Sequence, residues 1–144
     1  MNTTTPEENE IPEPTLPEIT FAELPERLRT AAGHVGWDSL MPVQQRAIPY
    51  LFAKRDVMMQ ARTGSGKTGA FLLPMLERLR ASKKYCQALI LVPTRELAKQ
   101  VEKEAKVLCR DSGLKTVAVY GGVGYGEQIQ AFKDGAQIVV GTPG

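Results

Sequence analysis

The residues in this chain best suited to chemistry form one glycine-rich loop of eight residues, which reads Ala61, Arg62, Thr63, Gly64, Ser65, Gly66, Lys67 and Thr68. Its glycines allow positive φ, so consecutive backbone N–H groups can converge on a phosphate at a helix N-terminus. Lys67 is then placed to bridge two phosphates of a nucleoside triphosphate, and the Thr68 hydroxyl to ligate Mg²⁺. The pattern predicts a phosphate-binding loop, with an ordinary glycine-rich turn as the alternative.

The residues on either side predict the two elements that would hold this loop in place. Asp56 to Ala61 is a short apolar run that we expect to form a strand, with the pair Met58 and Met59 in the core. Lys67 to Arg80 carries its apolar residues mostly on one helical face and is expected to be a helix. Together they predict a strand, a loop and a helix in sequence.

The alternation of strands and helices continues through the rest of the chain. Ala88 to Val92 is a continuous apolar run, typical of a parallel strand covered on both faces, and Thr94 can cap the helix that follows. Further strands are expected at 116–120 and 136–140, with a helix at 126–132 between them. Two helices are expected before the loop, one with Pro25 in its first turn that Gly33 can end, and one at 41–48 with Pro42 near its start and Pro49 near its end. This order predicts an α/β fold, a parallel sheet with flanking helices and right-handed crossovers.

Composition and charge bound the possible classes of protein. With 144 residues, 42% of them hydrophobic, the chain suits one globular domain. Residues 1–26 contain seven Glu and no Lys or Arg, whereas the rest contains 18 basic and 9 acidic residues. A basic body is compatible with a polyanionic partner, or with an ordinary solvated surface. Because residues 1–20 combine four prolines with Glu and Thr, we expect an acidic, Pro-rich disordered leader there and the domain at 21–144.

Several other classes of protein are disfavoured. The two cysteines, Cys86 and Cys109, lack the spacing of metal ligands and are too few for a disulfide scaffold, which predicts reduced thiols. The single histidine, His34, is expected to be exposed or at a helix end. No apolar run approaches the roughly 20 residues that span a bilayer, and the polar, acidic start does not read as a signal peptide. We therefore expect a cytoplasmic protein, or a nuclear one in a eukaryote, without membrane association.

A phosphate-binding loop alone does not distinguish kinases, GTPases and motor ATPases, so the choice depends on its surroundings. These surroundings resemble the DEAD-box family of ATP-dependent RNA helicases over roughly residues 21–144. The segments that carry the resemblance, in the order found in the family, are Gly36 to Pro49 for the Q motif, Ala61 to Thr68 for motif I, Pro93 to Ala98 for motif Ia, Gly121 and Gly122 with Gln128 for the GG segment, and Thr142 to Gly144 for the opening of motif Ib. The resemblance implies a P-loop NTPase domain of the RecA-like type, truncated at motif Ib.

The resemblance implies ATP and Mg²⁺ as ligands. Gln44 of the Q motif would select ATP over GTP, because a Gln amide offers together the donor and the acceptor that N7 and N6 of adenine require. Trp37 or Phe21 would stack on the adenine, with core packing as the alternative for either ring. The loop from Ala61 to Thr68 would hold the phosphates, with Lys67 and Thr68 in the catalytic roles and Thr68 as the metal ligand.

RNA is the second partner that the resemblance implies. Thr94 and Arg95 follow the second expected strand, at the carboxyl edge where open α/β sheets bind ligands. Backbone amides and a guanidinium there suit RNA phosphates, and phosphate contacts carry no sequence preference. The candidate RNA-binding residues are Pro93, Thr94, Arg95, Gly121, Gly122, Thr142, Pro143 and Gly144. Simple turn chemistry is the alternative for the glycines at this edge.

The residues that would complete ATP hydrolysis are not recognisable in the chain. Hydrolysis in this class needs an acidic residue at a strand end and an arginine opposite the γ-phosphate, yet no expected strand ends in Asp or Glu. We therefore interpret the chain as the N-terminal fragment of a longer, monomeric helicase whose second helicase domain lies C-terminal to it. The fragment itself is expected to bind nucleotide at most. A P-loop small-molecule kinase, or a complete non-catalytic nucleotide-binding module, is the alternative.

Overall fold

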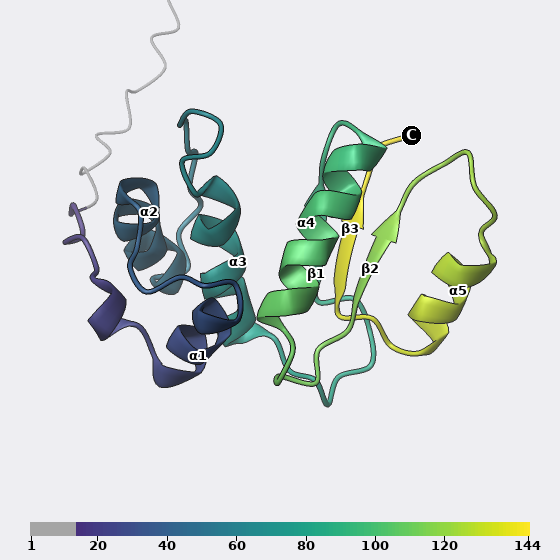
Figure 1. Cartoon of the computed structure of the whole chain (residues 1–144), viewed down its shortest axis with the longest axis horizontal. Coiled ribbons are helices and arrows are strands. Elements are labelled where there is room, and N and C mark those ends of the chain that lie inside the picture. The colour runs from purple at the N-terminus through teal and green to yellow at the C-terminus, as the bar shows by residue number, and fades with distance from the viewer. Residues whose placement is uncertain (1–13) are drawn as a thin grey trace, which may run out of the picture.

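The computed structural model describes residues 14–144, which form helices packed beside a small parallel sheet. Its elements are the 3-10 helix η1 (Phe21–Glu23), α1 (Glu26–His34), α2 (Pro42–Phe52), α3 (Lys67–Arg78), β1 (Ala88–Leu91), α4 (Arg95–Leu108), β2 (Thr116–Val119), α5 (Gly126–Lys133) and β3 (Ile138–Gly141). Figure 1 shows α1, α2 and α3 gathered on one side and the strands with α4 and α5 on the other. Within residues 14–144, no helix has the length and apolar character needed to cross a membrane.

The sheet confirms the predicted α/β architecture. Its three strands run parallel in the order β1-β3-β2. The chain passes from β1 to β2 through α4 and from β2 to β3 through α5, so both crossovers contain a helix. Ile90, Ile138 and Val140 point to the face that shares the main core with α4, and Val139 points to the opposite face, where Ala131 of α5 packs. Alternate residues of one strand therefore supply two separate cores.

The strand β1 is uncovered along one edge and on one face. Among the described residues β1 pairs only with β3, so its outer edge has no neighbouring strand. Leu89 and Leu91 lie on the face of the sheet opposite α4, and they are 61% and 62% exposed because α5 covers only the β2 side. Parallel strands are normally covered on both faces, which makes β1 an unusual feature of this chain.

The prediction of a strand before the phosphate-binding loop is wrong in the structure. Residues 56–61 are extended but belong to no sheet, because no other described strand lies beside them to share hydrogen bonds. Met58, predicted to be in the core, is 99% exposed, and Met59 is only partly buried. The second helix also runs past its predicted end, since α2 contains Pro49 and ends at Phe52.

Residues 14–20 lie along α2. The Leu16 N–H donates to the Tyr50 hydroxyl at 3.1 Å and the Ile19 N–H donates to the Gln45 carbonyl at 3.1 Å, while Glu18 pairs with Arg46 at 3.0 Å. This end of the leader predicted at 1–20 is therefore held against the domain by backbone hydrogen bonds and an ion pair to α2. Residues 1–13 of that prediction lie outside the described residues.

Candidate functional site

The glycine-rich loop has the backbone geometry that its sequence predicts. Gly64 and Gly66 adopt positive φ values of 78° and 88°, and Gly66 is the residue that precedes α3. Because α3 begins at Lys67, its free N–H groups and the positive end of its dipole face the loop. This local arrangement is suited to an anion, whatever the rest of the ligand.

Two side chains of the loop have hydrogen-bonding capacity that a phosphate would use. The Lys67 ammonium donates to the Ala61 carbonyl, so the lysine closes the loop on itself. The Ser65 hydroxyl is buried and has no hydrogen-bond partner. Buried polar atoms normally have partners, and phosphate oxygens would supply one to Ser65 and a stronger one to Lys67.

The loop can supply only part of a Mg²⁺ coordination shell. Thr68, which follows Lys67 on the first turn of α3 and is partly buried, offers a single hydroxyl. Residues 14–144 hold no group of three or more His, Cys, Asp or Glu side chains arranged to bind a metal. Because Mg²⁺ is usually held by few protein ligands together with phosphates and water, a nucleotide would have to bring most of its ligands.

Gln44 lies against the phosphate-binding loop and is only 2% exposed. Its side-chain Nε2 donates to the Gly66 carbonyl at 3.1 Å, and its Oε1 accepts from the Met41 N–H at 3.0 Å. The amide therefore joins the start of α2 to the loop, with one N–H and one lone pair still free. Its predicted contact with adenine stays a prediction and would use those remaining positions.

Gly66 and Gly69 allow this close approach. A Cβ on Gly69 would lie 2.6 Å from Gln44 Nε2 and 2.6 Å from the Trp37 ring, and one on Gly66 would lie 2.8 Å from Gln44 Nε2. Trp37 therefore contacts the start of α3 with the edge of its ring, and Phe21 packs against the main core. Both aromatic rings have packing roles here, and their stacking on a base stays a prediction.

A cleft of about 880 Å³ lies between the loop, the start of α2 and α4, and most of the predicted nucleotide-binding residues line it: Trp37, Gln44, Thr63, Gly64, Gly66, Lys67 and Thr68. The lining does not include Phe21, Ala61, Arg62 or Ser65. The cleft is also lined by residues that the sequence did not single out, among them Gly69, Gln100 and Glu104. Burial raises the pKa of the Glu104 carboxyl above its ordinary value of 4.5. Gln100 and Glu104 are four residues apart on one helix, so the sequence indicates that they share a face. It does not indicate that this face lines the cleft, because that depends on the packing of α4.

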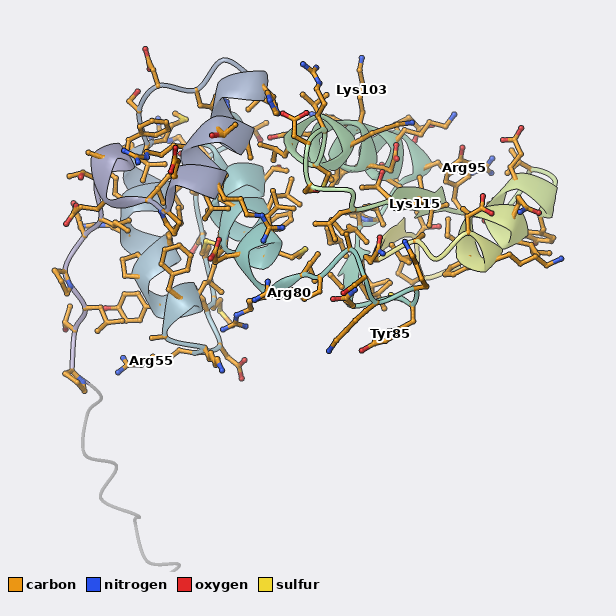
Figure 2. The ribbon with its side chains drawn as sticks, turned by 90° about the horizontal axis from the view of Figure 1, so that it is seen from below. Arg55, Arg80, Tyr85, Arg95, Lys103 and Lys115 are labelled. Atoms are coloured by element: carbon orange, nitrogen blue, oxygen red, sulfur yellow. The ribbon has the colours of Figure 1, made fainter. Side chains whose placement is uncertain are left out.

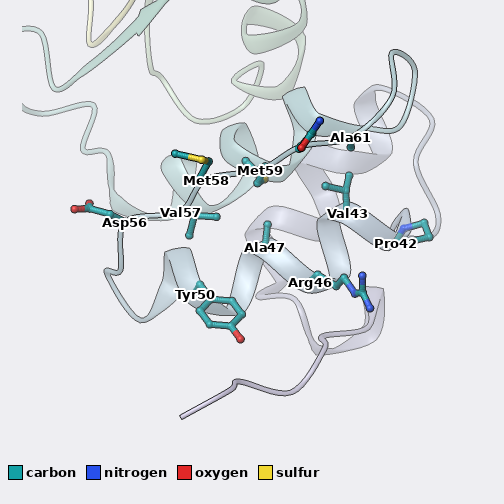
Figure 3. A pocket seen from close by; sticks show the side chains of 11 residues that line it. Pro42, Val43, Arg46, Ala47, Tyr50, Asp56, Val57, Met58, Met59 and Ala61 are labelled. Atoms are coloured by element: carbon teal, nitrogen blue, oxygen red, sulfur yellow. The ribbon is translucent and has the colours of Figure 1, made fainter. Parts of the chain in front are cut away.

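A second cavity, of about 530 Å³, lies between α2 and residues 56–61 and is distinct from the cleft. Figure 3 shows Val57 turned toward α2 and Met58 turned away from it. Because its lining stops at Ala61, before the glycines of the loop, this cavity does not present the N-terminus of α3 to a ligand. The cleft, rather than this cavity, is the candidate nucleotide site.

The candidate RNA-binding residues meet at the carboxyl ends of the strands. The Thr94 hydroxyl accepts from the Leu97 N–H at 3.2 Å and so caps α4, as predicted. The Arg95 guanidinium lies on the backbone of Gly122, where a Cβ would approach its nitrogen within 2.7 Å. The Thr142 N–H donates to the Val119 carbonyl at 3.1 Å, which brings the last residues beside the end of β2.

The other members of this set occupy the same edge or support it. Pro93 joins β1 to Thr94, Gly121 follows β2, and Pro143 and Gly144 are exposed beyond β3. The buried Gln128 is a support, because its Nε2 donates to the Tyr120 carbonyl at 3.1 Å and ties α5 to the end of β2. In Figure 1 the strands and the loop before α3 both end at the top of the molecule.

Comparison with protein families decides what kind of domain this is. Residues 41–144 match the family model described as DEAD/DEAH box helicase. The chain belongs to this family. The matched residues include the phosphate-binding loop, Arg95 and the GG segment, so the family and the geometry agree on the residues of interest.

Individual members of the family are also similar to the chain. It is 45% identical over 129 residues to ATP-dependent RNA helicase DeaD of Haemophilus influenzae, covering 88% of this chain and 21% of that protein, and 48% identical over 109 residues to DEAD-box ATP-dependent RNA helicase CshA of Streptococcus pneumoniae serotype 4, covering 76% and 21%. The chain thus spans about a fifth of the length of these relatives.

Solved structures of the family share the fold. A DEAD box protein from the hyperthermophile Methanococcus jannaschii superposes with a TM-score of 0.80 at 38% identity, over 88% of this chain and 35% of that one. The RNA helicase Prp28 from Chaetomium thermophilum bound to ADP gives a TM-score of 0.75 at 43% identity, over 83% and 30%. The fold is therefore that of part of a DEAD-box helicase domain.

Proposed function

We propose that the chain is the ATP- and RNA-binding part of an ATP-dependent RNA helicase, which couples ATP hydrolysis to the separation of short RNA duplexes. The observation that carries the proposal is that the phosphate-binding loop and the edge with Arg95 lie on one side of the molecule (Figure 1). The names of its relatives, ATP-dependent RNA helicases, support the same activity. The family speaks against the alternative of a small-molecule kinase.

ATP binding would exchange contacts within the loop for contacts with phosphates. Lys67 would leave the Ala61 carbonyl for the β- and γ-phosphates, and the Ser65 hydroxyl would gain a partner. Thr68 would hold Mg²⁺, which neutralises charge on the phosphates. A base bound to Gln44 would be linked directly to the loop, since the Gln44 Nε2 donates to the Gly66 carbonyl.

RNA binding would use the strand edge without reading the sequence. Arg95 offers a guanidinium held against Gly122, and the residues after β2 and β3 offer backbone N–H groups. Contacts of these kinds go to phosphates, so one site serves any RNA sequence. We also propose that the parent protein is monomeric and cytoplasmic and that it contains a second helicase domain.

Hydrolysis would require residues beyond those of this chain. Among the described strands β1, β2 and β3, none is followed directly by Asp or Glu. A catalytic carboxylate and an arginine opposite the γ-phosphate are therefore expected from other parts of the parent protein. Residues 1–144 are proposed to bind ATP without turning it over.

A titration with a fluorescent ATP analogue tests the proposal. Lys67→Ala should weaken binding by about tenfold or more, since it removes a charge-assisted contact to the phosphates. Lys83→Ala, which removes an exposed lysine beyond α3, is the matched control and should bind as the wild type does. Equal binding by Lys67→Ala would refute the nucleotide site. RNA-stimulated phosphate release that disappears in Lys67→Ala would refute the proposed lack of turnover.

A further inference from the structure

One face of α4 carries a continuous row of positive charge. Arg95, Lys99, Lys103 and Lys106 follow one another at spacings of four, four and three residues, and Arg110 continues the row just beyond the helix. Residues at these spacings share one helical face, and all five are exposed. We call these five residues the α4 stripe. Figure 2 shows Lys103 reaching outward from α4 into solvent.

Two of the three acidic residues of α4 make their contacts away from the α4 stripe. Glu102 accepts a hydrogen bond from the Thr116 hydroxyl on β2, and Glu104 lines the nucleotide cleft. Glu96 lies beside the row in the first turn, where a carboxylate complements the positive helix end. The salt bridges within residues 14–144 join His34 to Asp111 and Arg46 to Glu18, so none of them neutralises the row.

The α4 stripe begins at the candidate RNA-binding edge. Its first member, Arg95, lies on Gly122, and its second, Lys99, has its ammonium 5.4 Å from the centre of the Tyr120 ring. Tyr120 directly precedes Gly121 and Gly122, so two successive members contact the segment that follows β2. From Arg95 to Lys106 the row runs about 17 Å along the helix axis, given a rise of about 1.5 Å per residue.

We propose that the α4 stripe is an additional RNA-binding surface, which holds the backbone of RNA that continues past the strand edge. This inference rests on the proposed function, because the edge must first bind RNA. A row of about 17 Å is long enough to contact several consecutive phosphates of one RNA strand. Flexible lysines bind phosphates as point charges, so the surface extends the footprint of the protein on RNA and adds no sequence preference.

The test removes the charges furthest from the edge and leaves Arg95 and Lys99 intact. The variant is Lys103→Gln, Lys106→Gln and Arg110→Gln in the chain of residues 1–144. The matched control, Arg29→Gln, Lys83→Gln and Lys133→Gln, removes two lysines and one arginine that are exposed elsewhere. Fluorescence anisotropy measures binding of oligouridylates of about 5 and about 15 nucleotides across a range of salt concentrations, and urea unfolding checks that both variants fold.

The stripe variant should bind the longer RNA at least tenfold more weakly at about 0.1 M salt. Its salt slope should shrink by about 2, because three lost phosphate contacts each contribute roughly 0.7 for a single strand. Its affinity for the shorter RNA, and both affinities of the control, should match the wild type. An unchanged salt slope for the longer RNA, or an equal loss of affinity in the control, would refute RNA binding by the α4 stripe but not by the strand edge. A wild-type chain that binds neither RNA would overturn both.

Discussion

At the scale of single residues, two glycines allow close contacts, one in the nucleotide cleft and one at the strand edge. Gln44 and Trp37 reach the start of α3 because Gly69 has no Cβ, and Arg95 reaches its position because Gly122 has none. The two glycines differ in backbone conformation, since Gly122 has a φ of 81° whereas Gly69 lies inside a helix. Only at Gly69 can space be tested without backbone strain.

Gly69→Ala should therefore destabilise the chain and weaken nucleotide binding together. Alanine favours a helix by about 1 kcal/mol over glycine, but the new methyl group overlaps Gln44 and Trp37, and such overpacking typically costs about 1–3 kcal/mol. The control is Gly33→Ala in α1, where a Cβ meets nothing within 4 Å and the helical preference should raise the free energy of unfolding. Urea unfolding and the ATP-analogue titration give the two readouts. A Gly69→Ala chain as stable as Gly33→Ala would show that the contacts of Gln44 and Trp37 are not as described.

Residue types and spacing predicted the local features of the site but not its long-range contacts. The glycine conformations, the start of α3 at Lys67 and the cap by Thr94 follow from sequence neighbours, and each was expected. The hydrogen bond from Gln44 to Gly66 joins residues 22 apart in the sequence. Such contacts depend on how α2 packs beside α3, which no local pattern contains.

At the scale of elements, α4 combines three environments on one helix. Its apolar face packs against the sheet, Gln100 and Glu104 face the nucleotide cleft, and the α4 stripe faces solvent. Just past its end, Cys109 is buried, and this burial raises the pKa of its thiol from 9.0 to about 11, although Ser112 and Arg27 act in the opposite direction. The thiol is therefore neutral across the physiological range.

This burial links stability to alkaline pH. The pKa of Cys109 is higher in the folded chain than in the unfolded one, so the folded chain keeps its proton longer and the stabilisation is complete below pH 9.0 and lost as pH rises toward about 11. The free energy of unfolding should fall by up to about 1.4 kcal/mol per pH unit in that window because of this thiol. Cys109→Ala should lose that part of the slope, measured by urea unfolding. Cys86→Ala, at the exposed cysteine, should keep the wild-type slope, and equal slopes for all three chains would contradict the burial.

The elements also show where pattern reasoning stops. The alternation of apolar runs and helical faces predicted the parallel α/β sheet, since each run reflects its own burial on two faces. The same reasoning placed a strand at 56–61 and Met58 in the core, and both predictions were wrong. A strand needs a partner as well as a pattern, and the described residues supply none beside this segment.

At the scale of the whole molecule, exposed apolar surface gathers on the open side of the sheet. Leu89 and Leu91, on the uncovered face of β1, are among the most exposed large apolar side chains, and within residues 14–144 the outer edge of β1 has no neighbouring strand. The chain spans about a fifth of the length of its relatives, so further chain would be available in a longer protein to cover this side. Until it is covered, a free edge beside apolar residues favours self-association.

The bare face of β1 predicts an unequal response to the same substitution on its two sides. Leu89→Thr with Leu91→Thr should change the free energy of unfolding by no more than about 0.5 kcal/mol, because both side chains are exposed and Thr suits a strand. It should also lower light scattering by concentrated chain. Ile90→Thr, on the buried face of the same strand, should cost about 2 kcal/mol or more, since it leaves a hydroxyl among apolar side chains. If the double variant proved as costly as Ile90→Thr, another copy of the chain would have to cover that face in solution, and the proposal of a monomer would fall.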